Sequence, residues 1–524
     1  MFIWKVGDYV NSSSRKKNVI KNMFVGTIFQ VISLLMGFVN RTFFIKLLSA
    51  EYLGVNTLFT NILTILSFAE LGIGNAIIFN LYKPLAEDDK KQVNLLLKFY
   101  RNTYSLIGMI MLVTGLILIP FIPNLIETMP NISENIYVIY VLFLLDTVIS
   151  YFFTYRIAII QADQKNYVIV KTVQSFKIGQ IILQIILLYL THNYYLYVIL
   201  QLGCTICTYS YLAYKSKKMY PFTEKMPKEN LPKKTSKSIF RNVRALFIYK
   251  ISSVILNGTD SIIISKYLGL AVLGLYSNYL LIVSAITQVL SQVFNAFTAS
   301  VGNLIAVDHE GKSKKVFDQL FYFTTFVYCI FSICLYLLFN DFINIWLGDK
   351  YLLSNLVVFS IVLHFYINGT QFAAFTYRQT SGLFMQYRWS SVVAAILNIV
   401  LSIEWAKSIG LAGVFFATSV SRIVTSGWVD SLVIYKNVFK ERVGSFYLKY
   451  IFTFIKIMFF GVICYYASRF IVVNNVLMFI IKGLFISILS GTLFIITSLY
   501  THEFKELKSI GLNLLKRKWG IYGS

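Results

Sequence analysis

Residues 135–160 read NIYVIYVLFLLDTVISYFFTYRIAII, an apolar run whose only charged side chains are Asp146 and Arg156. About 20 apolar residues in a helix span the roughly 30 Å hydrocarbon core of a bilayer. The run is far longer than the roughly 10 residues of a transmembrane β-strand. It is therefore predicted to be a transmembrane helix.

Thirteen further runs have the same character, so we predict an all-α polytopic membrane protein with about fourteen transmembrane helices. The predicted spans are 22–47, 53–82, 99–122, 135–160, 168–190, 194–214, 245–266, 272–300, 317–340, 352–377, 385–403, 410–434, 447–468 and 476–499. An even number of spans places both ends of the chain on one side of the membrane.

The composition agrees with this prediction. Residues of the set AVILMFWYC make up 57% of the 524-residue chain and charged residues 14%, against roughly 45–50% and about 25% in soluble proteins. Too few charges remain to cover a water-facing surface. The net charge of +25 would suit a nucleic-acid-binding protein, but the cations lie between long apolar runs.

The positions of the cations predict the orientation, because Lys and Arg favour short loops on the cytoplasmic side. All but seven of the 48 Lys and Arg residues fall on the side of the two termini, which is therefore predicted to be cytoplasmic. The seven on the opposite side are Arg41, Lys46, Lys266, Lys350, Lys407, Arg469 and Lys482.

The chain also resembles itself at an offset of about 220 residues. LSAEYLG at 48–54 resembles LGLAVLG at 268–274, and LAEDDKKQV at 85–93 resembles IAVDHEGKSKKV at 305–316. Six predicted helices separate the copies, and an even number gives both the same orientation, as in parallel transporter repeats. We therefore predict two parallel six-helix lobes, followed by two C-terminal helices.

The expected domains follow from these patterns. They are an N-lobe at 1–214, a basic linker at 215–244, a C-lobe at 245–440, and a final helix pair with a basic cytoplasmic tail at 441–524. The linker carries ten Lys or Arg residues and three prolines. It is expected either to lie on anionic lipid headgroups, where each cation contributes about 1 kcal/mol, or to be a solvated loop.

Ionisable residues inside the predicted helices are the candidates for function, because each costs roughly 2.5–3.5 kcal/mol at the centre of a membrane helix. A wet cavity between two lobes would accommodate them, and interhelical ion pairing is the alternative. Its cations would suit an anionic ligand, and its acids could bind a coupling ion. The predicted substrate-binding residues are Arg41, Lys177, Lys250, Arg156 and Arg422, and the predicted ion-coupling residues are Glu70, Asp146 and Asp260.

Other charged residues lie within about one turn of a helix end and are expected to reach the membrane interface. These are Lys46, Lys171, Lys266, Arg378 and Arg388. Cys204 and Cys207 have CxxC spacing but lie in an apolar run without a second Cys or His pair, so no metal site is expected. The chain has no P-loop, GxSxG or HExxH motif, and neither an enzyme nor a cofactor is expected.

Four stretches resemble the polysaccharide-transport (Wzx-type) branch of the multidrug/oligosaccharidyl-lipid/polysaccharide (MOP) superfamily. They are GFVNRTFFIKLLSAEYLG at 37–54, AELGIGNA at 69–76, LNIVLSI at 397–403 and GLAGVFFAT at 410–418. The resemblance implies a flippase for undecaprenyl-diphosphate-linked oligosaccharides in the bacterial plasma membrane. It also implies two six-helix lobes around a cationic cavity and, as in lipid II flippases, a lipid-facing groove formed by two extra C-terminal helices.

The end of the first predicted helix differs from that of lipid II flippases. Lipid II flippases carry an Arg-Asp pair at the end of the first helix, where this chain has Asn40 and Arg41. The difference argues against lipid II as the substrate and favours a capsular polysaccharide, exopolysaccharide or related glycan. The expected partners are the lipid-linked oligosaccharide, membrane lipids, a coupling H⁺ or Na⁺, a polysaccharide polymerase and glycosyltransferases, with no nucleic acid.

Two alternatives stay open at this point. A drug/cation antiporter of the same superfamily would share the fold, but it usually has twelve helices and acidic binding pockets. A membrane-embedded polysaccharide polymerase or ligase would be expected to carry a large exterior loop with catalytic Arg or His, and every predicted exterior loop here is short.

The orientation can be tested with topology reporters. A reporter fused after Ser524 and one inserted near Thr235 should both be cytoplasmic, whereas one near Met129 should be exterior, because the cations concentrate on the side of the termini. Opposite locations for Ser524 and Thr235 would contradict the fourteen-helix prediction.

Overall fold

The computed structural model describes residues 12–70, 73–224, 227–232, 236–237, 239, 258–307 and 312–509. All regular elements in these ranges are helical, which confirms the predicted fold class. The chain forms two compact units, Met1–Gly274 and Leu275–Ser524. The domain boundaries proposed from the sequence stay a prediction.

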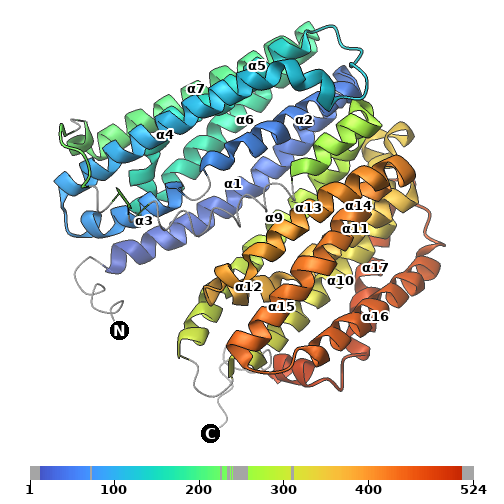
Figure 1. The fold of residues 1–524 in the computed structure, drawn as a ribbon. Helices are drawn as coiled ribbons and strands as arrows, with labels where there is room; N and C mark the ends of the chain where they lie inside the picture. The colour runs from blue at the N-terminus through green and yellow to red at the C-terminus, as the bar shows by residue number, and fades with distance from the viewer. Residues whose placement is uncertain are drawn as a thin grey trace. The chain divides into compact units, whose positions relative to one another are not determined.

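The first unit is a bundle of long helices. They are α1 (Ser12–Leu47), α2 (Ala50–Leu66), α3 (Ile73–Ala86), α4 (Lys90–Leu118), α5 (Ile136–Ala162), α6 (Asn166–Thr191) and α7 (Tyr194–Met219), with the start of α9 (Leu270–Val307). Helix α5 packs against α4 and α7, and α6 packs against α1 and α7 (Figure 1). These contacts place the polar faces of α5, α6 and α7 together.

The second unit contains the rest of α9 and a second bundle. Its helices are α10 (Lys312–Leu347), α11 (Asn355–Thr370), α12 (Phe372–Thr380), α13 (Phe384–Ile409), α14 (Leu411–Arg422), α15 (Trp428–Ile434), α16 (Gly444–Ser468) and α17 (Val476–Ile496). Helix α14 packs between α11 and α13, and α17 packs on α10 and α16 (Figure 1). Aromatic residues such as Phe317, Tyr377 and Phe446 form a buried core in this unit.

Among the described residues, eleven helices are long and apolar enough to cross a membrane. Irregular geometry accounts for two of the other predicted spans. The span at 53–82 is divided into α2, a 3₁₀ turn at Ser67–Glu70 and α3, and the span at 410–434 is interrupted by a π-helical turn at Ile423–Gly427. The third, 245–266, is described only from residue 258 onward. About fourteen transmembrane helices therefore fit this fold.

Part of the linker is docked on the first unit. Lys98 on α4 donates hydrogen bonds to the backbone oxygens of Lys228 and Glu229, and Asn94 donates to Phe222. Lys91 forms an ion pair with Glu229 at 2.9 Å. Helix α4 therefore holds the backbone of this part of the linker, and its contact with headgroups or solvent stays a prediction.

The repeated segments meet in a close contact within the first unit. A Cβ atom added to Gly54 would lie 2.0 Å from the backbone oxygen of Leu270, and one added to Gly274 would lie 2.0 Å from that of Ala50. The two contacts correspond under the repeat, because Leu270 and Gly274 are the counterparts of Ala50 and Gly54. Small residues of this kind let two membrane helices approach closely.

We predict that Gly54→Ala destabilises the protein, because the obstructing atom belongs to the backbone and cannot rotate away. Overpacking of this kind costs about 1–3 kcal/mol. The thermal unfolding midpoint of the full chain in detergent measures the effect. The control is Gly179→Ala on α6, where an added Cβ atom meets nothing within 4 Å. Equal midpoints for both variants would contradict the close contact.

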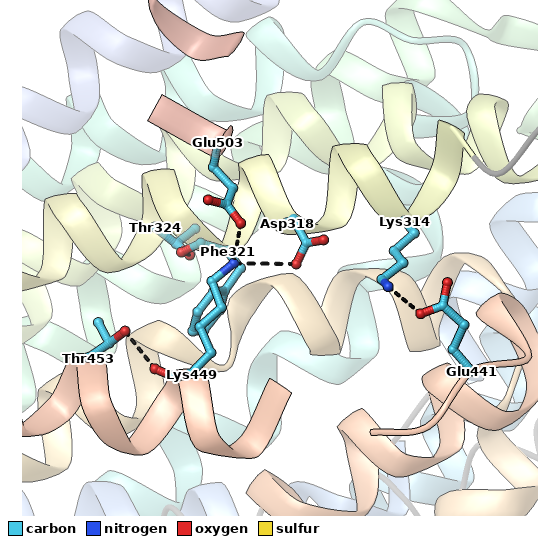
Figure 2. Close-up of polar contacts among 8 residues, drawn as sticks. All are labelled: Lys314, Asp318, Phe321, Thr324, Glu441, Lys449, Thr453 and Glu503. Atoms are coloured by element: carbon cyan, nitrogen blue, oxygen red, sulfur yellow. Dashed lines mark hydrogen bonds and ion pairs between the residues drawn. The ribbon is translucent and has the colours of Figure 1, made fainter. Parts of the chain in front are cut away.

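Ion pairs fasten α16 and the segment after α17 to one end of α10. The Lys449 ammonium lies 3.6 Å from the Asp318 carboxylate and also binds Glu503, as Figure 2 shows. Lys314 pairs with Glu441 beside them. The last two membrane helices are thereby joined to the second unit by charge as well as by apolar packing.

The Glu503 contact predicts a pH dependence. Burial alone would raise the pKa of Glu503, but hydrogen bonds, above all from Lys449, hold the pKa below its ordinary value of 4.5. A lowered pKa stabilises the folded state above that value, and the contribution disappears as the pH falls through the folded-state pKa. Lys449→Gln should therefore lower the thermal midpoint at neutral pH, because it removes a contribution on the order of 1 kcal/mol or less to the free energy of unfolding.

The difference between Lys449→Gln and the wild type should shrink below pH 4.5. Lys407→Gln is the matched control, because Lys407 forms an exposed pair with Glu404 at 3.8 Å and should unfold like the wild type. A difference that stays constant in acid would contradict this account.

Candidate functional site

A polar cavity of about 290 Å³ lies among α5, α6 and α7 of the first unit. Most of its lining residues carry amide, hydroxyl or charged groups, although all three helices have the composition of membrane spans. The lining residues are Asp146, Ser150, Val173, Lys177, Gln180, Gln201, Thr205, Thr208 and Tyr209. Such a concentration of polar groups inside spanning helices makes this cavity the candidate functional site.

The structure brings Asp146 and Lys177, two of the predicted site residues, together in this cavity. Gln201 donates a hydrogen bond of 2.8 Å from Nε2 to Asp146 Oδ2. Lys177 Nζ lies 3.5 Å from Gln180 Oε1, and Lys177 also lines the cavity. The site therefore contains one carboxylate held by an amide and one ammonium.

Two buried polar atoms of this site make no hydrogen bond within the described part of the chain. They are Asp146 Oδ1 and Gln180 Nε2. An unsatisfied buried polar group costs about 1–3 kcal/mol, so both atoms favour a partner that enters the cavity. One of them accepts and the other donates, which suits hydroxyl groups because a hydroxyl does both.

A second acid approaches the cavity from one side. Glu70 accepts a 2.9 Å hydrogen bond from the Tyr104 hydroxyl, and the ring of Tyr104 stacks on that of Tyr100. Tyr209 lines the cavity, and both Asp146 and Glu70 lie near enough to interact with it electrostatically. Two of the predicted coupling acids therefore lie near the same tyrosine of the cavity.

The other predicted cations lie elsewhere. Arg41 on α1 is half-buried beside Tyr197, whose hydroxyl accepts a 3.0 Å hydrogen bond from Asn40. Arg156 is 7% exposed and donates to the backbone and hydroxyl oxygens of Thr223 at 3.0 and 3.1 Å. Neither lines the polar cavity, and the contacts of Arg156 indicate that it fixes the segment after α7.

The remaining predicted residues are distributed between the two units. Asp260 belongs to helical residues 258–268 of the first unit and is half-buried. Arg422 on α14 donates a 2.7 Å hydrogen bond to Asn368 Oδ1 in the second unit. Lys250 lies outside the described residues.

One expectation about membrane-interface residues was wrong. Lys46 and Lys171 are exposed, as expected, but Arg378 is only 2% exposed and pairs with Asp430 at 3.1 Å. Arg378 therefore does not reach the interface, because a carboxylate on a neighbouring helix neutralises it inside the unit.

The neutral residues of the cavity were missed by the search for charges. A periodic signal was present, since Gln201, Thr205 and Thr208 follow one another at spacings of four and three residues. That spacing places them on one face of α7. Gln180 likewise follows Lys177 by one helical turn on α6.

The fold is shared with solved transporter structures. The chain aligns with "Lipid II flippase MurJ, inward closed conformation" at a TM-score of 0.62 and 18% identity, covering 92% of this chain and 99% of that one. It aligns with an inward-facing multidrug resistance MATE transporter of the MOP superfamily at 0.60 and 12% identity, covering 78% and 98%. An outward-facing MATE structure gives 0.54, with 80% and 96% covered at 12% identity.

No curated protein sequence matches the chain significantly. Residues 19–301, more than half of the chain, match the family described as "Polysaccharide biosynthesis protein". This match and the shared fold confirm the resemblance identified in the sequence. The chain belongs to the polysaccharide biosynthesis protein family and has the fold of MOP-superfamily transporters.

Proposed function

We propose that the protein is a flippase that moves undecaprenyl-diphosphate-linked oligosaccharides across the bacterial plasma membrane by alternating access, with both termini in the cytoplasm. Family membership and the fold of a solved lipid II flippase support a transporter for lipid-linked sugars. The glycan is proposed to be a capsular polysaccharide, exopolysaccharide or related repeat unit.

The observation that carries the proposal is the polar cavity in the first unit. An unpaired hydroxyl group in hydrocarbon costs several kcal/mol, so an oligosaccharide crosses only where the protein replaces water. The amide groups of Gln180 and Gln201 and the hydroxyl groups of Thr205 and Thr208 supply such partners. The neutral polar lining suits a sugar better than a hydrophobic drug, which favours apolar and aromatic walls.

The second unit contains a cavity that is apolar rather than polar. A largely apolar cavity of about 360 Å³ lies among α10, α11 and α16, with tyrosines at its edge. Its wall includes the buried Ile457, and the exposed Tyr465 and Tyr466 lie on the same helix. This cavity would accept part of a polyprenyl chain, because its walls are largely apolar and a hydrocarbon chain has no polar group that would need a partner there.

Ion coupling is proposed to act through Asp146, with Glu70 and Asp260 as further candidates. Protonation or cation binding at Asp146 would change the charge of the cavity that holds Lys177, and would so bias the transporter between states. The unpaired Asp146 Oδ1 supplies the position for the proton or cation.

The cations are proposed to bind the substrate diphosphate, with Lys177 in the cavity and Arg41 on α1 as the main contacts. Lys250, Arg156 and Arg422 are the weaker candidates. A guanidinium offers paired donors to phosphate oxygens, whereas an ammonium acts as a point charge. Arg41→Lys should therefore retain part of the transport activity, and Arg41→Ala and Lys177→Gln should lose most of it.

The measurement is translocation of a lipid-linked oligosaccharide in proteoliposomes at matched protein levels. Losing one charge-assisted contact costs about 1.5–3 kcal/mol, which corresponds to roughly 10- to 150-fold in affinity. Lys171→Gln is the control, because Lys171 lies on the same helix, is exposed and does not line the cavity. Wild-type rates for both Lys177→Gln and Arg41→Ala would contradict the diphosphate site. Export of organic cations without translocation of the lipid would instead identify a drug antiporter.

A further inference from the structure

The second unit contains a buried ion pair that the cavity of the first unit does not involve. Arg378 Nη1 at the end of α12 lies 3.1 Å from Asp430 Oδ1 on α15. The two residues are 2% and 4% exposed. The Arg378 guanidinium also stacks on Tyr387 of α13, 3.5 Å from the ring centroid. The cation therefore contacts both a carboxylate and an aromatic ring.

The Asp430 carboxylate also keeps one unsatisfied oxygen. Asp430 Oδ1 accepts no well-aligned hydrogen bond from any residue that the structure describes. It lines a cavity of about 140 Å³ together with the polar residues Thr370, Gln371 and Ser431. Trp428 forms the edge of this cavity and is 50% exposed. The cavity therefore leaves space beside the buried side chain of Asp430.

The backbone around Asp430 is also unusual. Helix α15 has only seven residues and lies between two π-helical turns, Ile423–Gly427 and Tyr435–Phe439. A Cβ atom added to Gly427 would lie 2.8 Å from Gln371 Nε2, so α12 and the first π-turn are in close contact. Single π-turns inside helices are frequent at functional sites.

We propose that Asp430 is a proton-accepting site whose charged form holds α15 to α12 through Arg378. A proton from the aqueous phase adds to the carboxylate, forms an O–H bond and leaves a neutral acid. Arg378 then remains as a buried cation without its counter-ion, which is unfavourable in a low-dielectric interior. Separation of α12 from α15 relieves this by admitting water to Arg378. For its role in coupling, this inference rests on the proposed transport function.

The groups that face Asp430 are consistent with one titrating carboxylate. Arg378 faces it from α12, Tyr387 of α13 reaches it only through Arg378, and Tyr447 and Tyr450 face the same cavity from α16. The π-turn at Ile423–Gly427 has no titratable side chain, and that at Tyr435–Phe439 contributes Tyr435 and Lys436. Among the described residues that line this cavity, Asp430 is the only acid.

Infrared spectroscopy of the full chain in lipid vesicles tests the proton site directly. On acidification the exposed acids of every variant gain a protonated-carboxyl C=O band, and the wild type should gain an additional component of this band that Asp430→Asn lacks. Asp341→Asn is the matched control, because Asp341 of α10 in the same unit is also ion-paired, at 2.8 Å to Lys482. Its spectrum should retain that additional component. Identical titrations of the wild type and Asp430→Asn would overturn the proposal.

A comparison of thermal unfolding midpoints tests the same ion pair without relying on one variant alone. Asp430→Asn and Arg378→Gln should each lower the thermal midpoint at neutral pH, and the double variant should recover part of the loss because no lone charge remains. The gap between the wild type and Asp430→Asn should narrow in acid, where the wild type loses its own ion pair. A gap that stays constant with pH would contradict proton uptake at Asp430.

Transport then tests the coupling separately. In proteoliposomes, an imposed proton gradient should accelerate the translocation of lipid-linked oligosaccharide less by Asp430→Asn than by the wild type, and Asp341→Asn should keep the full response. The infrared and stability measurements use no substrate. Failure of the wild type to translocate the lipid would therefore refute the flippase and leave the proton site standing, whereas an Asp430 that does not titrate would refute only this inference.

Discussion

The cost of an ionisable group in hydrocarbon, roughly 2.5–3.5 kcal/mol at the middle of a helix, governs the arrangement of both units. Each unit meets this constraint in its own way. In the second unit the charges of Arg378 and Asp430 neutralise one another over 3.1 Å. In the first unit Asp146 and Lys177 share a polar cavity of about 290 Å³. The paired charges stabilise a packing arrangement, and the cavity leaves polar atoms available for a ligand.

Much of the fold could be predicted from the sequence because the length of an apolar run decides whether a helix can span a bilayer. The repeat was also visible, and the close contact of Gly54 with Leu270 and of Gly274 with Ala50 gives it a physical basis. Breaks inside spans could not be predicted in this way. Hydropathy averages over a window and does not register the 3₁₀ turn that ends at Glu70 or the π-turns around Asp430.

The site was only partly predictable, because the sequence gives the depth of a residue in a helix and not its neighbour across the helix interface. Depth identified Asp146 and Lys177. Depth could not reveal that Arg156 is hydrogen-bonded to Thr223. Nor could it reveal that an ion pair with Asp430 on another helix allows Arg378 to be buried. Neutral residues such as Gln180 were missed because their free-energy cost in hydrocarbon is smaller than that of a charged residue. Their spacing on one face of the helix was nevertheless informative.

The central claim is that the polar cavity among α5, α6 and α7 receives the sugar headgroup of a lipid-linked oligosaccharide. Photocrosslinking tests it most directly, with a reactive group on the oligosaccharide, full-length protein in vesicles and mass spectrometry to locate the adducts. We expect adducts on peptides that contain Lys177, Gln201 and Tyr209. Unlabelled lipid-linked oligosaccharide should compete with the probe and abolish these adducts. Adducts confined to the lipid-facing surface, or unaffected by that competitor, would contradict it.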